Sequence, residues 1–192
     1  MQKTKKLLAG FTLIEVLVVV SIVGILSAII YVNFNDARNE VRNRAWQTEL
    51  KEVQLAIELY KSQNGTYPSP EVVCGTAEKA DVSRTDTCAL PIINNIAPDF
   101  IAELPAPTAS SNSACSLVYE VDSGTAPTWY KLSAVNCLEV VDVSAGTQAK
   151  DELALCPETC TNCAGVTRNS TFINSSTFYE TIAVYSAGGQ CE

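Results

Sequence analysis

Apolar residues form one nearly uninterrupted run close to the start of the chain. Phe11 to Val32 is a stretch of 22 residues with a single charge, Glu15. As an α-helix this stretch is about 33 Å long at ~1.5 Å per residue, enough to cross a hydrocarbon core of about 30 Å. The sequence therefore predicts a transmembrane helix over residues 11–34. The lysines among the first six residues place its beginning on the cytoplasmic side, so the rest of the chain lies outside the cytoplasm.

A second helical pattern follows without a proline to interrupt it. Apolar residues recur at spacings of 4, 3, 4 and 3, at Trp46, Leu50, Val53, Ile57 and Tyr60. This stripe predicts an amphipathic spine helix over residues 35–64, which ends at Asn64-Gly65. We expect the stripe to pack on the C-terminal part of the same chain, and a coiled coil with another protein is the alternative.

Residues 65–192 have the patterns of short strands and loops. Alternating, β-branched or aromatic stretches predict strands at 115–121, 128–135, 137–143 and 178–185. Prolines predict a loop-rich connection over 69–115, with one short helical turn at 99–104. Three or four antiparallel strands laid against the spine give an α+β fold, in which a long N-terminal helix packs on a small antiparallel β-sheet head.

Charge divides the chain in the same place as the pattern. Residues 1–61 hold eight Lys/Arg and six Asp/Glu, whereas residues 62–192 hold five and fifteen, a net charge of −10. An acidic head repels phosphates, so there is no strong signal for nucleic-acid binding. The chain has no histidine, which excludes Ser-His-Asp and Cys-His catalysis and His-containing zinc sites. We expect no enzyme activity, no cofactor and no metal site.

All eight cysteines lie in the predicted head, on the non-cytoplasmic side: Cys74, Cys88, Cys115, Cys137, Cys156, Cys160, Cys163 and Cys191. An even number in that compartment predicts disulfides. Order along the chain favours the pairs Cys74–Cys88 and Cys115–Cys137, and Cys191 is expected to pair with one of two cysteines, at 160 or 163. A metal or redox site formed by the cysteines at 156, 160 and 163 is the alternative.

The apolar run has four possible interpretations. A cleaved secretory signal needs small residues before the cut, and the best candidate, Leu26-Ser27-Ala28, begins with a large one. A lipoprotein signal needs a cysteine directly after the run, but the first cysteine is Cys74. A plain membrane anchor explains the length of the run but leaves Glu15 unexplained. The fourth interpretation accounts for all of these features.

The stretch Gly10-Phe11-Thr12-Leu13-Ile14-Glu15 resembles the processing site of type IV pilins and type II secretion pseudopilins. The resemblance implies that prepilin peptidase removes the basic leader 1–10 by cutting between Gly10 and Phe11. It also implies that Phe11 is then N-methylated, and it makes Glu15 the glutamate at the fifth mature position. The turn Asn64-Gly-Thr-Tyr-Pro68 is similar to the one that often ends the spine in this family. The implied fold is pilin-like, with a head over residues 65–192.

Glu15 also has a physical interpretation of its own. A carboxylate in an apolar helix costs roughly 2.5–3.5 kcal/mol at a bilayer centre and needs a partner. Cleavage after Gly10 creates an amine at Phe11, and the same amine on a neighbouring subunit comes within reach of Glu15 when helices bundle. We therefore expect Glu15 to set the register of assembled subunits. The alternative is that Glu15 lies near the lipid headgroups.

The resemblance implies a structural subunit of a type IV pilus-like or type II secretion filament. The expected partners are like subunits, prepilin peptidase and an assembly platform protein driven by a separate ATPase, since this chain has no phosphate-binding loop of its own. The expected location is the inner membrane, as a single-pass protein, before assembly, and an extracellular pilus or periplasmic pseudopilus afterwards. The alternative function is a monomeric, membrane-anchored, disulfide-rich binding or adhesion module.

Overall fold

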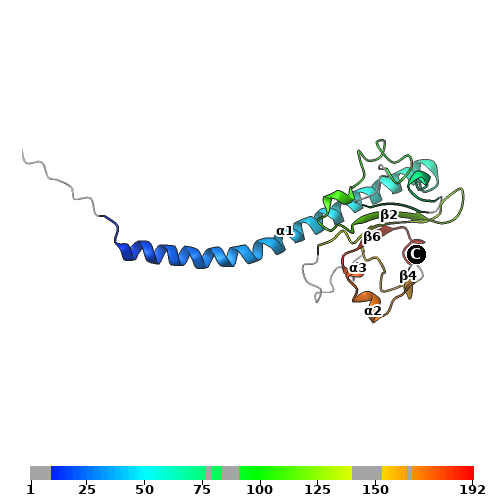
Figure 1. Cartoon of the computed structure of the whole chain (residues 1–192). Coiled ribbons are helices and arrows are strands. Elements are labelled where there is room, and N and C mark those ends of the chain that lie inside the picture. The colour runs from blue at the N-terminus through cyan, green and yellow to red at the C-terminus, as the bar shows by residue number, and fades with distance from the viewer. Residues whose placement is uncertain (1–9, 77–78, 84–90, 140–152, 164–165) are drawn as a thin grey trace, which may run out of the picture. The chain divides into compact units, whose positions relative to one another are not determined.

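The computed structural model describes residues 10–76, 79–83, 91–139, 153–163 and 166–192. These residues fall into two compact units, 1–38 and 39–192. The first unit contains the beginning of helix α1, and the second contains the rest of that helix and the head (Figure 1). Side chains at 29–33 and 35 of the helix lie outside the described residues.

Helix α1, Leu13–Asn64, is 52 residues long and continuous. It continues because no proline or glycine pair interrupts it, and it ends where Gly65 takes a left-handed φ of 81°. The Gly65 amide donates to the Lys61 carbonyl at 2.8 Å and the Asn64 side chain donates to the Tyr60 carbonyl at 2.9 Å. The predicted stop at Asn64-Gly65 is therefore correct.

The head contains a four-stranded antiparallel sheet in the order β1-β2-β3-β6 (Figure 1). Its strands are β1 (Lys79–Ser83), β2 (Ser116–Val121), β3 (Tyr130–Val135) and β6 (Ile182–Tyr185). A separate two-stranded sheet pairs β4 (Asn162–Cys163) with β5 (Val166–Thr167). Short helices complete the head: η1 (Val72–Cys74), η2 (Pro107–Ala109), α2 (Ser170–Ile173) and α3 (Ser176–Tyr179).

Several predicted head elements are wrong. The expected loop at 69–115 contains β1, a strand whose exposed and buried residues alternate and whose central apolar residues are only Ala80 and Val82. The expected strand at 137–143 is not formed over 137–139, because Asn136 turns the chain with a φ of 54°; residues 140–143 lie outside the described part. The expected strand at 178–185 begins only at Ile182, after helix α3.

The short helical turn predicted at 99–104 is also wrong, and the turn lies earlier. The amides of Phe100 and Ile101 both donate to the Ile96 carbonyl, at 2.9 and 3.3 Å. Ile96 is completely buried, so the carbonyl that accepts both bonds belongs to a core residue.

The spine stripe and one face of the sheet form the main core, which confirms the predicted α+β packing. Trp46 is 3% exposed, and Leu50, Val53 and Ile57 are fully buried. They share one hydrophobic cluster with inward-facing strand residues, namely Ala80, Val82, Leu117, Tyr119, Val121, Tyr130, Leu132, Ala134, Ile182 and Val184. Tyr60, the last predicted member, is half-buried, and its ring lies 5.4 Å from that of Phe100.

The turn after α1 is fixed to this core through its tyrosine. The Tyr67 ring lies 4.8 Å from the Tyr130 ring in an edge-to-face arrangement, and the Lys61 ammonium lies 3.9 Å from the Tyr67 ring centre. The Tyr119 hydroxyl donates to the Pro68 carbonyl at 2.8 Å. The Asn-Gly-x-Tyr-Pro turn therefore fixes the path of the chain from helix to head.

Because the stripe is buried, alanine substitution of two leucines in this helix is expected to change the stability of the head by very different amounts. Replacing the fully buried Leu50 by Ala is expected to lower the free energy of unfolding of the head by about 2–5 kcal/mol, because a cavity forms beside the sheet. The matched control Leu55→Ala, at a side chain that is 71% exposed, is expected to change it by less than about 0.5 kcal/mol. Urea unfolding of the full chain in mild detergent, followed by circular dichroism, measures both. Equal losses would contradict the packing of the stripe.

Candidate functional site

The first residues of α1 cap the helix with reciprocal hydrogen bonds. The Glu15 carboxylate accepts from the Thr12 amide at 2.9 Å and from the Thr12 hydroxyl at 2.7 Å. The Glu15 amide in turn faces the Thr12 hydroxyl oxygen at 3.4 Å. This is a capping box, which satisfies backbone groups that a helix leaves free at its beginning. The capping box is not among the features predicted from the sequence, although the Thr-x-x-Glu spacing is its usual signature.

The capping box places the predicted processing residues just before the helix. Gly10 and Phe11 precede α1, and the Phe11 side chain is 86% exposed. An added Cβ at Gly10 would meet nothing within 4 Å. The cleavage between these two residues, the methylation of Phe11 and the assembly role of Glu15 stay predictions.

Beyond the capping box, helix α1 exposes apolar side chains on every side. The exposed large residues between positions 13 and 26 are Leu13, Ile14, Val16, Leu17, Val18, Val19, Val20, Ile22, Val23, Ile25 and Leu26. A helix that is apolar on every side is stable in an apolar environment or among other helices, since exposing its apolar surface to water is unfavourable. Among the residues that the structure describes, no helix is long and apolar enough to cross a membrane.

The few polar groups on this surface bond within the helix. The Ser21 hydroxyl donates to the Leu17 carbonyl at 2.8 Å, and the Ser27 hydroxyl donates to the Val23 carbonyl at 2.7 Å. Their hydrogen-bonding capacity is thus used without water. Gly24 has open space where a Cβ would lie, so the backbone there is accessible to a close neighbour.

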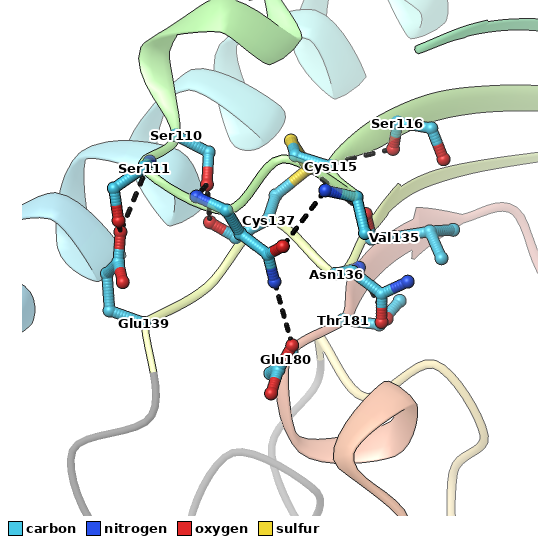
Figure 2. The surroundings of a disulfide bond; sticks show 12 residues. Ser110, Ser111, Cys115, Ser116, Val135, Asn136, Cys137, Glu139, Glu180 and Thr181 are labelled. Carbon is cyan, nitrogen blue, oxygen red and sulfur yellow. Dashed lines mark hydrogen bonds between the residues drawn. A yellow bond between two sulfur atoms is a disulfide. The ribbon is translucent and has the colours of Figure 1, made fainter. Parts of the chain in front are cut away.

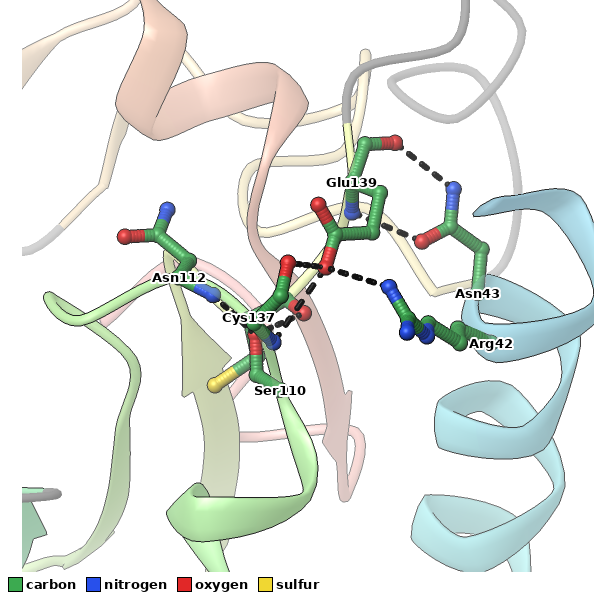
Figure 3. Close-up of polar contacts among 7 residues, drawn as sticks. Arg42, Asn43, Ser110, Asn112, Cys137 and Glu139 are labelled. Atoms are coloured by element: carbon green, nitrogen blue, oxygen red, sulfur yellow. Dashed lines mark hydrogen bonds and ion pairs between the residues drawn. The ribbon is translucent and has the colours of Figure 1, made fainter. Parts of the chain in front are cut away.

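In the second unit, a buried asparagine joins α1 to the loop after β3 (Figure 3). Asn43, which is 3% exposed, donates to the Glu139 carbonyl at 2.8 Å and accepts from the Glu139 amide at 2.7 Å. The Glu139 carboxylate also accepts from the amide and hydroxyl of Ser111, and it lies 3.7 Å from the Arg42 guanidinium. These contacts hold the helix, the loop before β2 and the loop after β3 together.

A disulfide lies directly beside this contact (Figure 2). Cys115 is joined to Cys137, the pair that order along the chain favours. The Ser110 hydroxyl donates to the Cys137 carbonyl at 2.9 Å, and the Asn112 side chain donates to Glu180 at 2.9 Å. The bonds tie the beginning of β2 to the end of β3 and to the turn before β6.

Two further disulfides close the C-terminal part of the head. Cys160 is joined to Cys191, one of the two expected partners, and Cys156 is joined to Cys163. These sulfurs surround Phe178 in a second small core. The three cysteines considered for a metal or redox site are all in disulfides here. Cys74 is also disulfide-bonded, and its predicted partner Cys88 lies outside the described residues.

A buried lysine contacts the C-terminal residue, next to the Cys160–Cys191 disulfide. Lys131 of β3 is 1% exposed, and its ammonium donates to the backbone oxygen of Glu192. Burial lowers the pKa of Lys131 to about 8, although the negative charges of Glu120 and Glu192 act in the opposite direction. Lys131 alternates with Tyr130 and Leu132, which lie in the core cluster with α1, so its side chain lies on the opposite face of the sheet.

Comparisons with known proteins match only part of this chain. Residues 7–31 match the family model described as the prokaryotic N-terminal methylation motif. The chain is 35% identical to the type II secretion system core protein G of Pseudomonas aeruginosa over 63 residues, which are 33% of this chain and 44% of that relative. The proteins of the same name from Aeromonas hydrophila and Vibrio cholerae are 32% and 34% identical over 71 residues, 37% of this chain and 48% of each relative.

These matches confirm the resemblance to pilins and pseudopilins over the N-terminal region. The match covers less than half the length of the curated relatives. No solved structure matches the chain. The family model covers residues 7–31, so all eight cysteines, the first of which is Cys74, lie outside that match.

The capping box predicts faster opening of the first turn when its hydroxyl is removed. Thr12→Val is expected to cost about 1 kcal/mol of local stability, which raises amide hydrogen exchange in the first turn of α1 about fivefold. The control Thr12→Ser keeps the hydroxyl and is expected to exchange at the wild-type rate. Exchange of the full chain in detergent, measured by mass spectrometry, tests this. Identical rates for wild type and Thr12→Val would contradict a capping role.

Proposed function

We propose that this protein is a pseudopilin, a structural subunit of a type II secretion filament, with no catalytic activity of its own. The proposal rests on the first part of α1. It is apolar on every side, has one carboxylate in its first turn and lies in the region that matches the N-terminal methylation motif. The relatives named type II secretion system core protein G favour a secretion filament over other type IV filaments.

In this proposal the chain has four segments. Residues 1–10 are a leader that prepilin peptidase removes, and residues 11–34 span the inner membrane before assembly. Residues 35–64 form the spine on which the head, 65–192, is built. Support for the span comes from the single charge in the 22 residues from Phe11 to Val32, and from serine hydroxyls that bond within the helix.

Assembly moves the helix from lipid into a bundle of like helices in a periplasmic filament. Both environments are apolar, so the transfer leaves the surface of residues 13–28 covered throughout. Glu15 then pairs with the Phe11 amine of a neighbouring subunit, which replaces the contacts it makes with Thr12 within one chain. An assembly platform in the membrane, driven by a separate ATPase, supplies the work.

The mature N-terminus is the first test. We expect the purified protein to begin at Phe11 and to carry one additional methyl group on its amine, since the leader ends at Gly10. Intact-mass and N-terminal peptide mass spectrometry measure this. The variant Gly10→Leu is the control, and it is expected to keep its leader because a bulky side chain replaces the residue before the cut. A wild-type protein that retains its lysine-rich leader would instead indicate a monomeric anchored module.

Removal of the carboxylate at position 15 is the second test. Glu15→Val is expected to be processed and inserted normally but to form no filaments, because the neighbouring amine loses its partner in an apolar environment. The matched control Glu40→Gln neutralises an exposed carboxylate of the same helix and is expected to assemble like wild type. Cross-linking and immunoblotting of sheared filaments give the readout. Normal assembly of Glu15→Val would overturn the register role.

A further inference from the structure

A groove of about 770 Å³ lies between the second half of α1 and the segment that leads to η2. Its walls are mostly apolar, and three carboxylates lie among them. The lining residues are Glu49, Glu52, Pro91, Ala97, Pro98, Ile101, Ala102, Glu103, Leu104, Pro105 and Ala106. We call this the acidic groove.

Within the part of the chain that the structure describes, the carboxylates of Glu49, Glu52 and Glu103 in the acidic groove form no ion pair. Partial burial, and then the negative charge of Glu52, raise the pKa of Glu49. A positive group placed between them would relieve this repulsion.

The same helix supplies such a group one to two turns earlier. Arg44 is exposed on α1, whereas Arg42 already contacts Glu139 of its own chain. Arg44 bonds Glu40 at 2.5 Å, but the two side chains are 74% and 57% exposed. An exposed pair at this spacing stabilises the helix by only about 0.3–0.5 kcal/mol, so exchanging it for a less exposed partner costs little.

We propose that the acidic groove binds Arg44 of a second copy of this chain, between Glu49 and Glu52. The proposal rests on the filament function above and names the surface that joins neighbouring heads and spines. Arg44 precedes Glu49 by five residues and Glu52 by eight. Two parallel helices therefore bring them level when one copy is displaced by about 7.5–12 Å along its axis.

The displacement has the same direction as that required at the beginning of the helix. Glu15 follows Phe11 by four residues, so pairing with the Phe11 amine of a neighbour displaces that copy by about 6 Å in the same sense. Parallel copies without displacement would instead place arginine beside arginine and glutamate beside glutamate. Charge order along α1 thus favours a staggered arrangement over an unstaggered one.

Apolar residues on the same side of α1 extend the contact. Leu55 follows Glu52 by three residues and Leu59 follows Leu55 by four, spacings that place them on one helical face. Leu55 is 71% exposed and Leu59 is 47% exposed. A second copy in the acidic groove would cover this face, and it would add apolar burial to the charge contact.

The contact is tested by reversing the charge on each side separately and then on both sides together, in cells that assemble the wild-type chain. Arg44→Glu alone and Glu49→Arg with Glu52→Arg are each expected to lower the amount of filament at least about tenfold, because like charges then meet. Combining all three changes restores opposite charges and is expected to recover most of the filament. Glu158→Arg, at an exposed head residue outside the groove, is the matched control and is expected to have no effect.

The outcomes separate this proposal from the filament function. If the wild type forms filaments and Glu15→Val does not, but both reversals assemble normally, the groove contact is wrong and the filament function stands. Failure of the combined variant to recover, together with loss of wild-type filaments in a chelator, would assign the carboxylates to a divalent cation and overturn the proposal. Thermal unfolding checks that each head is folded. If a reversal unfolds it, Glu49→Gln with Glu52→Gln replaces that variant and is expected to lower filament yield severalfold.

Discussion

An apolar helical surface that the described chain does not cover is the constraint on which the rest of this protein depends. The first half of α1 exposes large aliphatic side chains on all sides, and the capping box satisfies the backbone at its beginning. Such a helix gains little from packing on its own head and much from lipid or from other helices. The single carboxylate at its start then becomes a selective element, since it is costly wherever no cation is near.

The second half of α1 satisfies the opposite requirement, because its apolar stripe is covered by the chain's own sheet. Asn43 extends that stripe by three residues from Trp46, and it uses its amide to bond both backbone groups of Glu139. The disulfide between Cys115 and Cys137 lies next to this contact. Asn43 thus holds the head to the spine at a place where a disulfide joins two head segments, and hydrophobic packing holds the head along the rest of the stripe.

Charged groups lie in two parts of the same helix, at its beginning and in its second half. In the proposed filament, the Glu15 carboxylate and the Phe11 amine of a neighbour define a displacement between copies. Farther along α1, Arg44 precedes Glu49 and Glu52, so the same sense of displacement would bring opposite charges together. The head carries the excess negative charge of the chain, and the acidic groove places one head carboxylate, Glu103, with two spine carboxylates, Glu49 and Glu52, beside an apolar surface. The proposed association of copies therefore combines apolar burial with a direction set by charge.

The sequence by itself determined the long helix, its end at Asn64-Gly65 and the buried stripe from Trp46 to Ile57, because helical periodicity and backbone preferences are local properties. It also indicated the processing motif and the pairing of Cys115 with Cys137. Only the tertiary structure decided which residues meet across the head. It showed that residues around Ala80, which have little strand pattern in the sequence, form the edge strand β1. Hydrogen bonds to β2 stabilise this strand, and such pairing cannot be predicted from the local sequence. It also ended β3 at Asn136 and joined Asn43 to Glu139, since such contacts depend on chain segments far apart in sequence.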